Sequence, residues 1–217
     1  MNRIPMSRRS LALGAGLVTC GLAPVTLGAV SEYTSYAAWS GITGTSVLGT
    51  ENFSGFSDYS ATASGSAGGV GWNASATGGL FASSVGGSQV MSTNTLAPPL
   101  IFTFTFAGGL TGVGGNIFAT DIDFGVISRT VEVVVGLADS TTFTFTRTIA
   151  SATDFWAFHS DGSFITSIVI SDPAGTGYAT MDNLAFMSGG TAPAVPLPGA
   201  AGLAAIALAG LSRRRRR

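Results

Sequence analysis

Hydrophobic and polar residues alternate with a period of two over much of the chain between residues 100 and 186. The clearest runs are "IFTFTF" (101–106), "TVEVVV" (130–135), "TTFTFT" (141–146), "FWAFH" (155–159), "FITSIVIS" (164–171) and "YATMDNLAF" (178–186). Successive side chains of a β-strand point to opposite faces, so each run predicts a half-buried strand. No stretch of useful length has a helical period. The pattern therefore predicts an all-β fold, an antiparallel β-sandwich of the jelly-roll kind.

Residues 60–95 are rich in Gly, Ser and Ala, a composition that suits either a flexible loop or weak strands. Apolar residues recur there at strand-like spacing, which favours strands joined by long loops. The segment "GVGGN" (112–116) lacks the spacing and context of a dinucleotide-binding loop, so we expect a turn.

The first 31 residues have the organisation of an export signal. Arg3, Arg8 and Arg9 precede an apolar stretch over 11–27, which small residues follow. "SRRSLAL" (7–13) is compatible with a twin-arginine signal and with an ordinary secretory signal. We expect cleavage after Ser31 or a few residues earlier.

The last residues form a short apolar segment followed by a basic cluster. The uninterrupted apolar run over 199–211 has 13 residues. As a helix it would be about 20 Å long, whereas a bilayer core is about 30 Å thick. Arg213, Arg214, Arg215, Arg216 and Arg217 form a stop that stays cytoplasmic under the positive-inside rule. The segment suits a transient membrane helix better than a permanent anchor.

These features predict a signal peptide (1–31), an ectodomain (32–191) and a C-terminal tail (192–217). Val195, Pro196, Leu197 and Pro198, with the apolar helix and the arginines, resemble the PEP-CTERM sorting tails whose motif begins VPLPA. Gly199 departs from that motif. The ectodomain also resembles a domain that PEP-CTERM proteins carry, through segments that include "YTSYAAW" (33–39), "GVGGNIFATDIDF" (112–124) and "TMDNLAF" (180–186).

The resemblance implies that an exosortase, a membrane protease, cleaves near the motif. The protein would then pass to the surface or exopolysaccharide layer of a Gram-negative bacterium. The alternative is a generic tail anchor.

Charge and cysteine content exclude several classes of function. Residues 32–191 contain two arginines, no lysine and eleven acidic residues, a net charge of −9 (2 − 11). Nucleic-acid affinity depends on clustered cations, so a nucleic-acid partner is not expected. The single cysteine, Cys20, lies in the predicted signal peptide, which leaves no disulfide framework.

Asp182 and Glu51 are the candidate metal ligands. Asp182 has the strand parity of Leu184 and Phe186, and a buried carboxylate is costly unless it is paired or metal-bound. The "DN" at 182–183 resembles the last strand of jelly-roll carbohydrate-binding modules, in which such an Asp joins an early Glu at a structural calcium. Glu51 would be that partner. The alternative is that Asp182 caps backbone N–H groups.

Catalytic pairs are hard to assemble from this sequence. If Asp121 and Asp123 faced outward on one strand, they would lie about 7 Å apart, a spacing that an inverting glycosidase can use. A solvated polar face is the simpler interpretation. His159 is the only histidine, and a triad with Asp161 would lack a "GxSxG" nucleophile turn. We therefore expect a protein that is not an enzyme.

Aromatic residues can form a sugar-stacking platform, because their rings pack on the apolar faces of sugars. The candidates are Trp72 and Trp156 above all, together with Trp39, Tyr36, Tyr59 and Tyr178. The alternative is that the tryptophans belong to the core. The sequence thus predicts an exported surface or matrix protein that is structural or exopolysaccharide-associated. The rival functions are a calcium-containing carbohydrate-binding module and a glycan hydrolase.

Overall fold

In a computed structural model of the chain, residues 29–189 form a 13-stranded antiparallel sheet and one short helix. In chain order the elements are β1 (Val30–Tyr33), α1 (Tyr36–Ser40), β2 (Thr45–Glu51), β3 (Asp58–Ala67), β4 (Val70–Val85), β5 (Ser88–Thr93), β6 (Leu100–Thr105), β7 (Gly112–Thr120), β8 (Val126–Ile127), β9 (Arg129–Leu137), β10 (Thr142–Ile149), β11 (Phe155–Ser160), β12 (Ile165–Ser171) and β13 (Tyr178–Gly189). The predicted all-β antiparallel class is confirmed. The predicted signal peptide and sorting tail, including Val195–Pro198 and Arg213–Arg217, lie outside the described residues.

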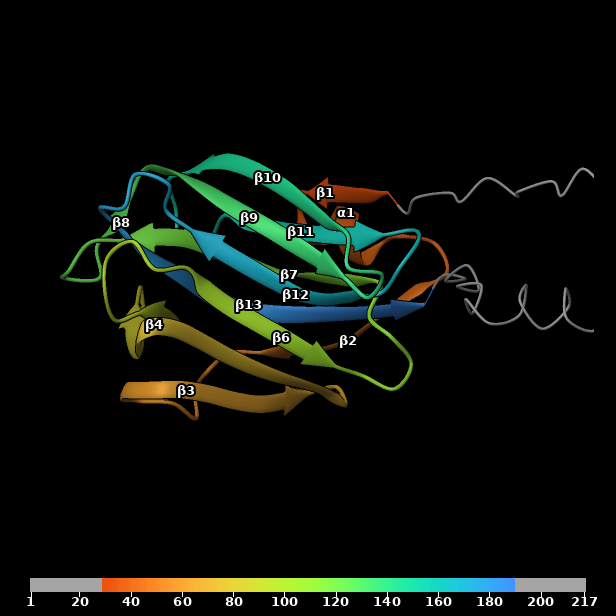
Figure 1. Cartoon of the computed structure of the whole chain (residues 1–217), viewed down its shortest axis with the longest axis horizontal. Coiled ribbons are helices and arrows are strands. Elements are labelled where there is room, and N and C mark those ends of the chain that lie inside the picture. Colours follow the sequence, from red (N-terminus) through yellow and green to blue (C-terminus); the bar gives the residue numbers. More distant parts are fainter. Residues whose placement is uncertain (1–28, 190–217) are drawn as a thin grey trace, which may run out of the picture.

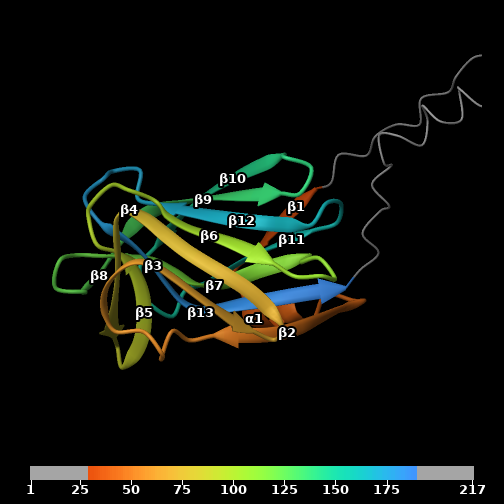
Figure 2. The same ribbon diagram turned by 60° about the horizontal axis from the view of Figure 1, so that its bottom comes forward.

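The strands form one continuous sheet that curls over and almost closes on itself. Its order is β1-β11-β7-β13-β5-β4-β6-β12-β9-β10, with β2 on β13, β3 on β4 and β8 on β7. The first and last strands of that path, β1 and β10, come near each other (Figures 1 and 2). Strand β4 joins the two halves, because residues 71–75 pair with β6 and residues 80–85 pair with β5. Gly78 and Gly79, with φ of +89° and +87°, lie between those two stretches.

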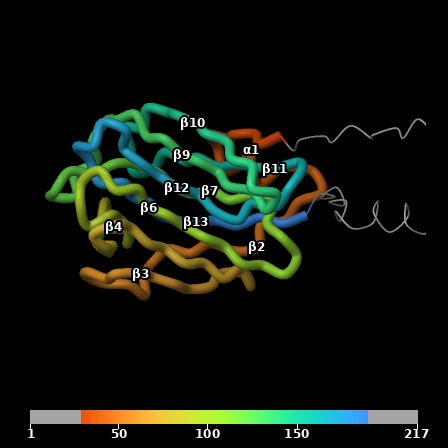
Figure 3. Tube along the Cα trace, in the orientation of Figure 1, coloured from red at the N-terminus to blue at the C-terminus, as the bar shows by residue number. Residues whose placement is uncertain are grey.

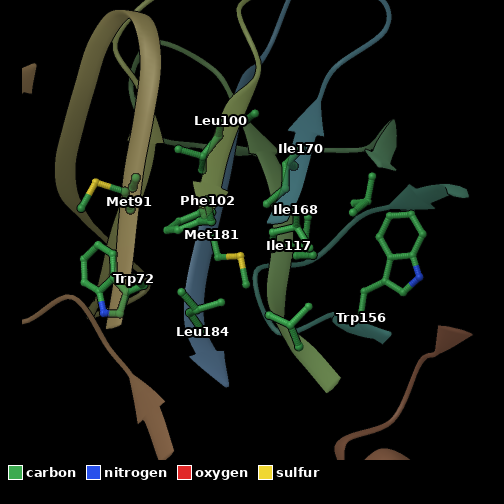
Figure 4. Packing of buried hydrophobic residues seen from close by; sticks show 14 of the residues in the cluster. Trp72, Met91, Leu100, Phe102, Ile117, Trp156, Ile168, Ile170, Met181 and Leu184 are labelled. Carbon is green, nitrogen blue, oxygen red and sulfur yellow. The ribbon is translucent and has the colours of Figure 1, made fainter. Parts of the chain in front are cut away.

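The main core lies between the two halves of the sheet (Figure 4). Phe102 of β6 and Ile168 of β12 contribute from one half, and Ile117 and Met181 from the other. The predicted inward faces are confirmed, since the alternate phenylalanines of β6 and valines of β9 are buried. Burying one such side chain fully contributes about 1.5–3 kcal/mol.

The glycine-rich segment forms strands with tight turns. Gly68–Gly69 joins β3 to β4, and Gly86–Gly87 joins β4 to β5. The predicted strands are therefore confirmed, whereas the expected long loops are wrong. At Gly68, with φ of +59°, a Cβ atom would lie 2.2 Å from the carbonyl oxygen of Leu48.

Two local expectations are wrong because neighbouring elements approach closely. "GVGGN" lies in β7 and not in a turn. A Cβ on Gly114 would lie 2.1 Å from the Cβ of Ala157, so glycine permits the close approach of β11. We also expected one face of β11 to be exposed, but both faces are buried. Trp156 packs in the main core, and Ala157 packs with Trp39 of the unpredicted helix α1.

The described chain begins and ends at the same end of the molecule. β1 starts and β13 finishes at the right-hand end of Figure 1, and β8 lies at the other end, as the trace in Figure 3 also shows. β1 begins at Val30, two residues before the start that we expected for the ectodomain. The Asp161 N–H donates to the Ala29 carbonyl at 3.1 Å. Within residues 29–189 no helix is long and apolar enough to cross a bilayer.

Candidate functional site

A bulge in β13 lies beside the candidate site. Asp182 pairs with Asn116 of β7 and Ala185 pairs with Gly114, so two residues, Asn183 and Leu184, lie opposite the single Gly115. Asn183 has φ of +51°, a left-handed conformation that asparagine tolerates better than most residues. The bulge shifts the alternation, since Met181 and Leu184 both pack in the main core. Asp182 therefore does not share the face of Leu184 and Phe186, as strand parity had predicted.

Asp182 holds the side chain of Asn183 in place. The Asn183 backbone N–H donates to Asp182 Oδ1 at 2.7 Å, and Asn183 Nδ2 donates to Asp182 Oδ2 at 3.0 Å. Nδ2 also donates to Asn116 Oδ1 at 3.0 Å. Asp182 is only 4% exposed, and burial raises the pKa of its carboxyl, while Ser88 and the Asn183 N–H partly offset that rise. The outcome is a pair of amide side chains in a defined orientation.

A groove of about 320 Å³ opens beside these two amides, and we call it the amide groove. Asn116, Asn183 and Thr50 supply polar atoms, and Tyr36 and Phe155 supply aromatic rings. Thr153 and Ala185 also line it. The rings of Tyr36 and Phe155 meet edge to face, with centroids 5.5 Å apart and an interplanar angle of 86°.

Helix α1 holds Tyr36 at the edge of the amide groove. Trp39, one turn later, is fully buried, and its Nε1 donates to the Phe158 carbonyl at 3.2 Å. Tyr36 remains 48% exposed, with its ring centroid 6.2 Å from that of Trp39. The buried tryptophan thus fixes a one-turn helix that would not be stable in isolation.

The amide groove combines aromatic edges with neutral hydrogen-bonding groups. An amide side chain offers two N–H donors and a carbonyl acceptor, and a threonine hydroxyl can donate or accept. None of the described residues that line the groove is charged at neutral pH. Such a surface suits a neutral, polyhydroxylated ligand better than an ionic one.

Trp72 and Trp156, the predicted sugar-stacking residues, are buried. They are 3% and 0% exposed. Their Nε1 atoms donate to Glu51 Oε2 at 3.2 Å and to Glu32 Oε2 at 3.0 Å. Neither ring has a face open to a ligand, so the prediction of stacking by these two residues is wrong. Among the predicted aromatic candidates, Tyr36 and Tyr59 are the exposed ones.

The geometry does not support a calcium site at Asp182 and Glu51. Glu51 Oε1 accepts from the Phe53 N–H at 2.8 Å and Oε2 accepts from Trp72 Nε1, while Asn183 occupies both oxygens of Asp182. Among residues 29–189 no three His, Cys, Asp or Glu side chains gather as metal ligands would. Glu51 and Asp182 act as acceptors for protein donors.

The candidate catalytic residues have structural contacts. β7 ends at Thr120, so Asp121 and Asp123 lie in a turn and not on a strand, which corrects the predicted arrangement. Asp121 Oδ1 accepts from the N–H groups of Asp123 and Gly125 at 3.0 and 2.7 Å. His159 is buried, with Nδ1 3.1 Å from Asp161 Oδ1. Its Nε2 bonds no hydroxyl in the described part of the chain, so no triad is assembled there.

Neither a protein-family model nor a curated protein matches this sequence. The candidate site therefore rests on geometry alone. Sequence reasoning had singled out Tyr36 and the "DN" dipeptide at 182–183 but missed Asn116, Thr50, Thr153 and Phe155. Asn116 and Asn183 are 67 residues apart, and only the register of β7 against β13 brings them together.

Proposed function

We propose that this chain is an exported bacterial surface or matrix protein whose β-domain binds exopolysaccharide through the amide groove. The observation that supports it is the pairing of the Tyr36–Phe155 aromatic edge with the amides of Asn116 and Asn183. A sugar ring has an apolar C–H face that packs on aromatic rings, and its hydroxyls donate to and accept from amides. A neutral groove open to solvent fits a polysaccharide segment.

The two ends of the sequence support export and sorting. We infer that the export machinery removes the signal peptide and that an exosortase-type protease cuts near Val195–Pro198. β13 ends at Gly189, six residues before Val195 (195 − 189), so such a cut would leave every described strand intact. The tail would then be in the membrane only transiently.

Binding is favoured over hydrolysis. The property expected of a hydrolase is a carboxyl group whose pKa is raised in a cleft, and Asp182 has a raised pKa. Both of its oxygens, however, accept hydrogen bonds from Asn183, and its side chain does not line the amide groove. We also infer that the β-domain has a fold of the jelly-roll kind, because its single antiparallel sheet folds over one core.

The test of glycan binding uses the protein purified from its host, on a glycan array and then by titration with the host exopolysaccharide. Tyr36→Ala should weaken binding about tenfold, which corresponds to about 1.4 kcal/mol. Tyr59→Ala is the matched control, because Tyr59 is 58% exposed and does not line the groove. Absence of glycan binding, or equal losses in both variants, would overturn the proposal.

The proposed processing at the C-terminus is tested by measuring the intact mass of the mature protein recovered from the medium and from the cell envelope. We expect a mass that corresponds to a chain ending near Pro196. A membrane-bound protein that retains Arg217 would contradict exosortase processing.

A further inference from the structure

A second hollow, of about 180 Å³, lies where β13 begins. We call it the end hollow. Its walls come from Phe81 of β4, Thr93 at the end of β5, Tyr178 of β13 and the turn over 121–125. β13 starts at the end of the molecule that carries β8, away from the end where β1 starts (Figure 1). The end hollow therefore faces away from the side on which the predicted sorting tail would attach.

One wall of the end hollow is apolar. The rings of Phe81 and Phe124 stack with centroids 5.4 Å apart and an interplanar angle of 29°. Phe124 is in the left-handed region, with φ of +61°, within the turn that Asp121 caps. Ile122, at the tip of the same turn, is 74% exposed. The turn thus holds two large apolar side chains at the hollow, Phe124 packed against the main core and Ile122 exposed to solvent.

The opposite lining is polar and incompletely satisfied. Thr93 is 2% exposed, and its Oγ1 has no hydrogen-bond partner among the described residues. A buried hydroxyl without a partner costs about 1–3 kcal/mol, which a ligand hydroxyl can recover. Asn94 donates its Nδ2 to the Gly78 carbonyl at 3.2 Å, and within residues 29–189 no donor bonds its amide oxygen. The carboxylate of Asp121, which lines the hollow, disfavours an anionic ligand.

We propose that the end hollow binds one neutral sugar unit that carries a methyl group, either a 6-deoxyhexose or an acetylated hexose. The cavity is too small for a polysaccharide segment and suits a single ring. The methyl group would pack on Phe81 and Phe124, and the ring hydroxyls would reach Thr93, Asn94 and Asp121. Uronic acids are disfavoured by the Asp121 carboxylate.

The end hollow would give the domain a second contact with a glycan. Tyr178 of the end hollow and Asn183 of the amide groove are five residues apart on β13, roughly 17 Å. One polysaccharide held at both points would bind with higher avidity than at either alone. This two-point attachment rests on the proposed function, whereas sugar binding in the end hollow does not.

The test is a titration of the ¹⁵N-labelled full chain, followed through its amide signals, with three matched sugars. They are D-galactose, its 6-deoxy counterpart D-fucose, and 6-O-acetyl-D-galactose. Signals from residues 93–94 and 122–124 should shift. D-fucose or 6-O-acetyl-D-galactose should bind about fourfold more tightly than D-galactose, which carries no methyl group, because one methyl group is buried. Comparing the affinities for the 6-deoxy and the 6-O-acetyl sugar shows which of the two kinds of methyl-bearing sugar the hollow prefers. No shift, or equal affinity for all three sugars, overturns the proposal.

Thr93→Val tests the hydroxyl without changing the shape of the side chain. Because Thr93 Oγ1 lacks a protein partner, the stability of the fold should not fall, whereas affinity for the methyl-bearing sugar should fall about fivefold. Loss of stability, or unchanged affinity, contradicts the proposal. Tyr36→Ala is the control and should leave the shifts at 93–94 unchanged. If the proposed function is wrong, Tyr36→Ala will not weaken polysaccharide binding, whereas Thr93→Val will still weaken binding of the small sugar.

Discussion

Replacing Asn183 by glycine and by alanine separates the backbone conformation of the β13 bulge from the hydrogen bonds of the asparagine side chain. Both variants lose the two bonds from Nδ2, to Asp182 Oδ2 and to Asn116 Oδ1. At about 1 kcal/mol for each bond, this loss lowers the free energy of unfolding by about 2 kcal/mol.

Only alanine adds a backbone cost at this position. A Cβ-bearing residue in the left-handed region costs about 1 kcal/mol relative to glycine, and Asn183 has φ of +51°. We therefore expect destabilisation by about 2 kcal/mol for Asn183→Gly and about 3 kcal/mol for Asn183→Ala. The decisive comparison is which variant has the lower free energy of unfolding, because in an ordinary strand position glycine is less stable than alanine.

Urea unfolding followed by tryptophan fluorescence measures both values. Trp39, Trp72 and Trp156 are at most 3% exposed, so their emission should change on unfolding. The same pair of substitutions at Asn73, an exposed residue within β4, is the control, and there alanine should be more stable than glycine. If alanine is at least as stable as glycine at position 183, the left-handed bulge and the amide groove built on it are wrong.

Two further predictions concern stability. Gly68→Ala should lower the free energy of unfolding by more than the usual left-handed cost of about 1 kcal/mol, because the new Cβ would meet the Leu48 carbonyl. A smaller loss, measured by urea unfolding, would refute the tight β3–β4 turn. Burial lowers the pKa of His159 below its ordinary 6.5, with Asp161 partly offsetting this. The unfolded chain then takes up the proton more readily, so stability is retained above pH 6.5 and lost as the pH falls through the lowered pKa, with a slope of at most about 1.4 kcal/mol per pH unit. His159→Gln should remove that part of the pH dependence, and equal profiles would exclude the effect.

Period-two alternation predicted the strands whose two faces have different surroundings. In β6 and β9 the buried and exposed positions follow the sequence pattern, because one face packs in the core and the other meets solvent. The pattern says less about β11, since Trp39 of α1 covers its second face. A five-residue helix is too short to show a helical period.

The candidate site depended on features that alternation does not encode. The inserted residue in β13 reverses the parity of everything after it, and so Asp182 was assigned to the wrong face. The tryptophans were candidates because aromatic rings stack on sugars, yet the large apolar area of those rings also makes them strong core residues. A "DN" pair within an otherwise apolar strand was the one local signal, because asparagine is among the few residues that enter the left-handed region readily.

The place of β13 in the sheet has a consequence for how the chain folds. It is the last described strand in the sequence, yet it lies between β7 and β5 and also pairs with β2. Until it is synthesised, β1-β11-β7 and β5-β4-β6-β12-β9-β10 are two separate sheets, each with an open edge where β13 will pair. Such edges can pair with other chains. Emergence of Gly189 thus becomes the event that permits cooperative folding, and truncation anywhere within β13 should yield an aggregation-prone product instead of a smaller stable domain.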